Sequence, residues 1–243
     1  MDNIVKGGKN IYGIKIGILM LETIFPRIPG ELGNATSFRY PVRYQIVKGA
    51  SPNKVVREKD PSLLEPFING AQELEKFGVK AITTNCGFLA QFQPEMANAV
   101  NIPFFSSSLM QIPMIYRMLK KDQKVGVLTV NGASLTPDLF KKIGGESIPI
   151  VVKGLEKEEE FTHVLLDNAF MMNVDKSRAE NVKVAKELIK ENPDVGAIVL
   201  ECTNMPPYAK AIQEAVQLPV FDIFTLTDMV YNSLVKSEIT GYM

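Results

Sequence analysis

The chain contains two cysteines, Cys86 and Cys202, and their type and spacing are the first features that suggest chemistry. Each one is the last residue of a predicted strand. Moving the sequence by 116 positions (202 minus 86) superposes the two cysteines, and the same shift places Val79 on Val195 and Pro103 on Pro219 without a gap. Two thiols in equivalent places of a repeated unit could act on opposite faces of one ligand, as a base and an acid.

The repeat extends to the first strand of each half, and this predicts how the thiols are positioned. Lys15–Met20 and Lys124–Thr129 share a Lys-apolar-Gly-apolar-Leu pattern. Apolar strands that alternate with helices are typical of α/β proteins with parallel sheets. We therefore predict two similar parallel-sheet α/β lobes related by internal duplication, residues 1–121 with Cys86 and residues 122–243 with Cys202. Ligands of such sheets bind beyond the strands' carboxyl ends, so the active site is expected in the interlobe cleft.

Hydrophobic periodicity places helices between these strands. Apolar residues recur at helical spacing over Pro61–Phe77. Two further helical segments are expected, one over residues 88–100 with a kink or a restart at Pro94, and one over residues 109–119. The stretch from Glu22 to Arg39 is rich in proline and glycine, and loops of this length are usually functional or disordered. This loop is expected to influence the choice of substrate.

The predicted position of each cysteine, directly before a helix, bears on its reactivity. Free backbone N–H groups and the positive end of the helix dipole both favour a thiolate, so a pKa below the usual ~8.5 is expected. One ionised and one protonated thiol on opposite sides of a carbon could invert its configuration. Buried cysteines are usually inert, but matched placement in both repeats favours a functional interpretation.

Short polar residues near the thiols could donate hydrogen bonds to a substrate carboxylate or an enolate. For any one of them taken alone, helix capping is the more common role. The candidates next to the cysteines are Thr84, Asn85, Gly87, Thr203 and Asn204. Two more, Asn131 and Ser134, follow the first strand of the second half, and Arg27 lies in the loop from Glu22 to Arg39.

The composition argues against several other classes of function. Lysine plus arginine equal aspartate plus glutamate, at 27 each, so the molecule has no general attraction to nucleic acid or an anionic membrane. The apolar run at residues 16–21 is too short to span a membrane and lacks a cleavage site. We therefore expect a cytoplasmic protein with reduced thiols. Two thiols without further ligands make a poor zinc site, and no metal or other cofactor is expected.

The sequence resembles the aspartate/glutamate racemase superfamily, whose members include glutamate, aspartate and hydantoin racemases that work without pyridoxal phosphate. The resemblance is carried by Thr84-Asn85-Cys86-Gly87, by Glu201-Cys202-Thr203-Asn204 and by the duplication, and covers the chain from about residue 14. It implies that Cys86 and Cys202 are acid/base thiols and that Asn85, Thr203 and Asn204 contact the substrate. It also implies a homodimer and a last strand and helix, at about 220–243, that return to the first lobe.

The leading hypothesis is a cofactor-independent racemase or epimerase, an isomerase that acts on an amino acid of the aspartate or glutamate type. Glutamate racemases have Asp-Ser where Glu22-Thr23 stands, and a histidine where this chain has Asn204-Met205, so the substrate stays open. One alternative is a maleate isomerase-like or decarboxylase-like enzyme of the same fold, with a cysteine nucleophile or acid. An inactive carboxylate-binding module is a second alternative, and an interlobe disulfide between Cys86 and Cys202 is a third.

Overall fold

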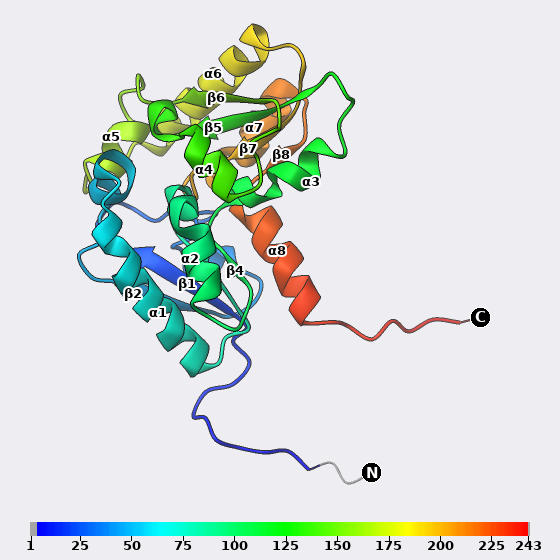
Figure 1. Cartoon of the computed structure of the whole chain (residues 1–243). Coiled ribbons are helices and arrows are strands. Elements are labelled where there is room, and N and C mark those ends of the chain that lie inside the picture. The colour runs from blue at the N-terminus through cyan, green and yellow to red at the C-terminus, as the bar shows by residue number, and fades with distance from the viewer. Residues whose placement is uncertain (1–3, 243) are drawn as a thin grey trace.

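A computed structural model describes residues 4–242 of the chain, which form two parallel four-stranded sheets with flanking helices (Figure 1). This confirms the predicted α/β class and the two similar lobes. The first sheet has the order β2-β1-β3-β4 and the second has the order β6-β5-β7-β8, so the topology is repeated. The strands are β1 (Ile16–Leu21), β2 (Val42–Val47), β3 (Ala81–Thr84), β4 (Phe104–Phe105), β5 (Lys124–Thr129), β6 (Ile150–Gly154), β7 (Val195–Leu200) and β8 (Val220–Phe221).

The helices differ in length more than the hydrophobic periodicity predicts. Residues 88–100 form a 3-10 helix (Gly87–Phe92) followed by α2, with Pro94 in the first turn of α2, so a new helix starts at this proline and the segment is not one kinked helix. Proline fits there because it lacks only an N–H that has no helical partner. The α-helices are α1 (Leu64–Phe77), α2 (Gln93–Asn98), α3 (Ile112–Tyr116), α4 (Pro137–Lys142), α5 (Phe161–Leu166), α6 (Val174–Glu191), α7 (Ala209–Val216) and α8 (Ile223–Leu234).

In the first lobe, β1 has all six residues buried and divides them between two faces. Leu19 and Leu21 belong to the cluster that contains α1, whereas Ile16, Ile18 and Met20 pack with residues of α8. Successive side chains of a strand point to opposite faces, so a strand covered on both sides has no polar position. This explains the continuous apolar run in the sequence.

The C-terminal segment from residue 220 is shared between the lobes. The strand β8 pairs with β7 and therefore remains in the second sheet. The helix α8 crosses to the first lobe, where Ile223 and Leu226 are buried on the first sheet and Asp228 accepts a hydrogen bond from Tyr40 at 2.8 Å. In the first half, α3 likewise follows β4 and lies against β5 of the second lobe (Figure 1).

The strand registers bring the carboxyl ends of both sheets to the junction of the lobes. The backbone N–H of Asn85 donates to the Leu19 carbonyl at 2.9 Å, and Glu201 donates to Leu128 at 2.8 Å. These pairs are equivalent under the repeat, since 85 and 201 differ by 116 and 19 and 128 differ by 109. Across the junction, the Thr203 hydroxyl donates to the Asn85 carbonyl. Among the described residues, none of the helices is both long and apolar enough to cross a bilayer.

Candidate active site

Both thiols line one small cavity at the junction of the lobes. Each cysteine comes two residues after its strand, so that Asn85 separates Cys86 from β3 and Glu201 separates Cys202 from β7. Both cysteines are free, which argues against the disulfide alternative. The cavity has a volume of about 30 Å³. Its other lining residues are Leu21, Phe25, Pro52, Val56, Asn85, Gly87, Phe88, Val130, Leu165, Leu166, Glu201 and Asn204.

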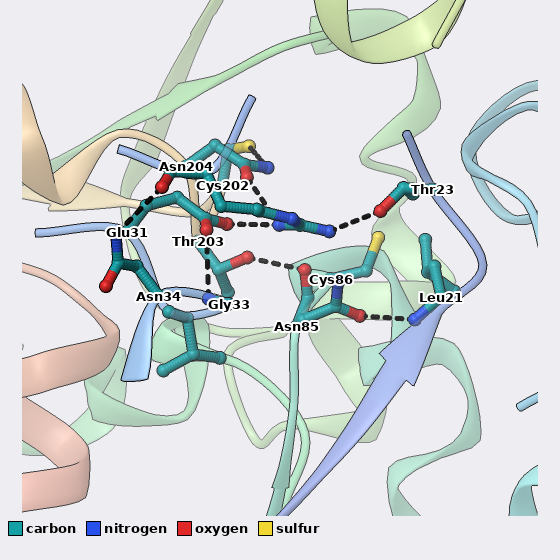
Figure 2. A network of polar contacts seen from close by, with 12 residues as sticks. Leu21, Thr23, Glu31, Gly33, Asn34, Asn85, Cys86, Cys202, Thr203 and Asn204 are labelled. Carbon is teal, nitrogen blue, oxygen red and sulfur yellow. Dashed lines mark hydrogen bonds and ion pairs between the residues drawn. The ribbon is translucent and has the colours of Figure 1, made fainter. Parts of the chain in front are cut away.

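A hydrogen-bonded chain connects Cys202 to the loop that follows β1 (Figure 2). The Asn204 side-chain amide donates to the Cys202 sulfur at 3.3 Å. Its carbonyl oxygen accepts from the Arg27 guanidinium at 3.0 Å, and Arg27 also donates to the Thr23 hydroxyl at 2.7 Å. Arg27 therefore fixes Asn204, and Asn204 presents its N–H to the thiol.

Arg27 has a buried carboxylate partner, Glu31, which also accepts from the Gly33 backbone N–H at 2.9 Å. Burial raises the pKa of Glu31 to about 7, and the nearby Arg27 charge opposes this rise. The guanidinium also stacks over Phe25, 4.2 Å from the ring centroid. The loop predicted to influence the substrate thus carries an ion pair next to the thiols.

Glu201 belongs to the motif Glu201-Cys202-Thr203-Asn204 but is not among the site residues predicted from the sequence. It is fully buried and lines the cavity. One carboxyl oxygen, Oε2, accepts from the Thr129 hydroxyl at 2.7 Å, whereas Oε1 has no hydrogen-bond partner within residues 4–242. Burial raises its pKa to about 8. An acidic residue at the end of an otherwise apolar strand was the sequence signal that could have identified it.

The expectation of low thiol pKa values is wrong, because burial raises the pKa of both thiols. For Cys86 the negative charges of Glu201 and Cys202 add to the effect of burial. The pKa of Cys202 is raised to about 12 by burial and by Glu201, against the opposing Asn204 donors. A helix dipole contributes only ~0.3–1 kcal/mol. Full burial shifts a pKa by up to ~3–5 units, which corresponds to ~4–7 kcal/mol and is the larger effect. The helices that follow the cysteines are short 3-10 helices, Gly87–Phe92 with six residues and Pro206–Tyr208 with three.

The remaining candidates beside the cysteines have distinct positions. Asn85 and Gly87 line the cavity. The Asn85 side chain accepts from the Leu21 backbone N–H at 2.8 Å, so its oxygen is already occupied (Figure 2). Thr84 donates to the Ser106 carbonyl at 2.7 Å and does not line the cavity. Thr203 is buried at the junction, where its hydroxyl holds the two lobes together.

The two candidates after β5 do not join the thiols. Ser134 lines a separate groove with Lys142 and Phe92. Asn131 precedes the same turn, and its buried side-chain oxygen has no hydrogen-bond partner among the described residues. Neither residue lines the thiol cavity. Within residues 4–242, no three His, Cys, Asp or Glu side chains are grouped so that they could hold a metal ion.

Segments from both lobes cover the cavity. Val56 lies in a π-helix (Asn53–Glu58) of the first lobe, and Leu165 and Leu166 belong to α5 of the second. Two polar contacts connect the covers. Arg57 pairs with Asp167 at 3.0 Å, and the Ile24 backbone N–H donates to Asn168 at 2.8 Å.

Comparison with known proteins gives the family. The model of the Asp/Glu/hydantoin racemase family matches residues 50–227, and the chain belongs to this family. The fold is also that of an arylmalonate decarboxylase variant (TM-score 0.62, 16% identity, 94% of this chain and 97% of that chain). An aspartate racemase homologue from Pyrococcus horikoshii gives a TM-score of 0.54 at 19% identity, covering 89% of this chain and 99% of that one.

Relatives with higher sequence identity than these two structures are named for a different activity from the one expected. A dimethylsulfoniopropionate lyase from Durusdinium sp. clade D is 30% identical over 239 residues, 96% of this chain and 79% of that protein. Dimethylsulfoniopropionate lyase 7 from Emiliania huxleyi is 32% identical over 220 residues, 86% of this chain and 64% of that protein. The leading hypothesis of an amino-acid racemase, an isomerase, is therefore wrong. The alternative of another enzyme with the same fold and a catalytic cysteine is better supported.

Proposed function

We propose that this protein is a lyase that cleaves dimethylsulfoniopropionate or a similar β-sulfonio carboxylate. The observation that carries the proposal is the pair of free thiols on one cavity, in a chain whose relatives over most of its length are named for this activity. Both thiols must be reduced for such chemistry, which supports a cytoplasmic location as part of the proposal.

The reaction is an elimination that begins with proton removal beside a carboxylate. A cysteine thiolate takes a proton from the carbon next to the carboxylate, and the carbanion electron pair forms a double bond to the neighbouring carbon. The bond from that carbon to sulfur breaks, and its electron pair leaves with neutral dimethyl sulfide. Propenoate is the second product, and the proton on the thiol returns to solvent. Proton transfer by a positioned group typically contributes ~10²–10⁴-fold in rate.

Cys202 is assigned as the base because the Asn204 side chain donates to its sulfur at 3.3 Å, and such a bond stabilises a thiolate. Cys86 of the first lobe lines the same cavity. The raised thiol pKa values fit a cationic substrate, because a sulfonium charge within a few ångströms favours the thiolate. The substrate then supplies a positive charge at the moment when the base is needed.

Binding requires the covering segments to separate. Pockets for small ligands typically have volumes of ~300–1,000 Å³, and the cavity measures about 30 Å³. The two contacts between the covers, Arg57–Asp167 and Ile24–Asn168, involve exposed or half-exposed groups. Breaking them therefore costs little free energy, about 0–1 kcal/mol for the exposed ion pair.

The test is release of dimethyl sulfide, measured by headspace gas chromatography, with propenoate followed by NMR. Wild type should form both products in equal amounts, and Cys202→Ser should lose at least about 100-fold in rate. Ser134→Ala is the control, since Ser134 lies in a separate groove and the variant should retain the rate. A folded wild-type protein that releases no dimethyl sulfide would refute the proposal. Full activity in Cys202→Ser would refute the assignment of the base.

A further inference from the structure

The two lobes present different chemistry at equivalent positions beside the thiols. Asn85 and Glu201 correspond under the 116-residue repeat, and each donates its backbone N–H to the first strand of its own sheet. The side chains differ, since one position holds a neutral amide and the other a carboxyl group. The backbone of the site is thus symmetric, but its charge is not.

Glu201 lines the cavity, and one of its two carboxyl oxygens receives no hydrogen bond from the described residues. Its Oε2 accepts from Thr129, whereas its fully buried Oε1 has no partner among the described residues. Gly87 of the other lobe lies against this oxygen, and a Cβ at that position would be 2.2 Å from Oε1. A buried acceptor without a donor is costly, so its retention calls for a physical reason.

We propose that Glu201 recognises the sulfonium cation of the substrate. It thereby selects carboxylates that carry an onium group over carboxylates with an uncharged group in its place. This role rests on the proposed lyase function. A sulfonium group is positively charged but has no N–H or O–H to donate. An ammonium or guanidinium ligand would satisfy Oε1 by a hydrogen bond, whereas a sulfonium satisfies it through charge alone. An acceptor left without any donor matches such a ligand.

Other groups near the thiols cannot supply this negative charge. Glu31 is paired with Arg27, so that pair has no net charge to offer. One face of the Phe25 ring is already stacked by the same guanidinium. Apart from the two thiols, Glu201 is the only ionisable side chain among the described residues that line the cavity.

The proposal also orients the substrate. With the sulfonium at Glu201, its methyl groups meet the apolar lining, which includes Val130 and Leu165. The carboxylate is repelled by Glu201 and turns toward the Asn204 amide, whose N–H already reaches the Cys202 sulfur. The carbon between the two charged ends then lies at the thiols, where the proton is removed.

The experiment compares two ligands that differ only in charge. One is trimethylammonio-propanoate, and the other is its isostere in which an uncharged tert-butyl group replaces the trimethylammonium group. Calorimetric binding to wild type at pH 9, above the raised Glu201 pKa of about 8, should favour the cation by about tenfold or more, as expected for a buried opposite charge within a few ångströms. Glu201→Gln should bind both ligands within about twofold of each other. Glu201→Asp should keep most of the preference, and Glu214→Gln, at an exposed position of α7, is the control that leaves the site intact.

The outcomes separate this inference from the proposed function. A Glu201→Gln protein that melts cooperatively and still prefers the cation would overturn the role of Glu201. A preference that falls as much in Glu214→Gln as in Glu201→Gln would also overturn it. A wild-type protein that prefers the cation through Glu201 but releases no dimethyl sulfide would refute the lyase while leaving the recognition intact. Lyase activity with equal binding of the two ligands would refute only the recognition.

Discussion

The substitution Glu201→Gln should change how protein stability depends on pH. Burial raises the pKa of Glu201 from its ordinary value of 4.5 to about 8 in the folded protein. Between these two values the unfolded chain has lost the Glu201 proton but the folded protein keeps it. Stability therefore falls as pH rises through this window, because the folded state binds more protons there. Glutamine does not titrate, so the variant should lack this part of the pH dependence.

The expected size follows from the shift. A rise of about 3.5 units corresponds to about 5 kcal/mol when the whole window is crossed, at 1.36 kcal/mol per unit. Between pH 5 and pH 8 the wild type should lose on the order of 3 kcal/mol relative to Glu201→Gln. Glu201 is fully buried, so solvent screening does not reduce this figure. Glu31 also titrates in this range, but it is present in both proteins and cancels in the difference.

Urea unfolding of both proteins near pH 5, 6, 7 and 8, followed by circular dichroism, gives the difference directly. The free energy of unfolding of the variant minus that of wild type should rise steadily across the series. Glu214→Gln, on the exposed face of α7, is the matched control and should give a flat difference. A flat difference for Glu201→Gln would refute the reasoning, since it would mean that the folded protein does not hold the proton.

Three further predictions concern the same site. Gly87→Ala should lose about 1–3 kcal/mol in urea unfolding because the new Cβ would lie 2.4 Å from the Glu201 backbone carbonyl. Gly196→Ala should lose less, because its Cβ would meet only the ends of two side chains, Gln123 at 2.8 Å and Leu119 at 3.0 Å. The kcat/KM for elimination should rise with pH beyond 9, since both thiols have raised pKa values. In Glu201→Gln the rise should begin at lower pH, because Glu201 raises the pKa of both thiols, and an identical profile in the two proteins would contradict this. Arg57→Ala should speed iodoacetamide labelling of the thiols, because the half-exposed pair with Asp167 bridges the covers, while stability should change by less than about 1 kcal/mol.

The fold could be predicted from the sequence because the duplication is visible in it. The 116-residue shift aligns β3 with β7, and the 109-residue shift aligns β1 with β5. Strands buried on both faces are read as continuous apolar runs, as in β1 and β7. The boundaries of the short helices could not be predicted as well, because a 3-10 helix and the α-helix that follows it share one run of apolar residues.

The thiol environment could not be predicted from local rules. A cysteine before a helix suggests a lowered pKa, but the effect of desolvation depends on how closely the other lobe approaches. Here Gly87 allows Glu201 to lie against the first cysteine's segment, and the carboxyl raises the pKa of both thiols. Ser134 shows the same limit, since its turn follows β5 as expected but faces another groove.

Racemisation and elimination share their first step, which explains why the sequence motifs did not separate them. In both reactions a thiolate removes a proton from the carbon next to a carboxylate. The outcome then depends on the substrate, because a carbanion with an onium group on the neighbouring carbon expels that group faster than a second thiol can return the proton. A racemase handles two mirror-image ligands and benefits from two equivalent walls. An elimination handles one ligand with two different ends, and the pair Asn85 and Glu201 gives this site two different walls.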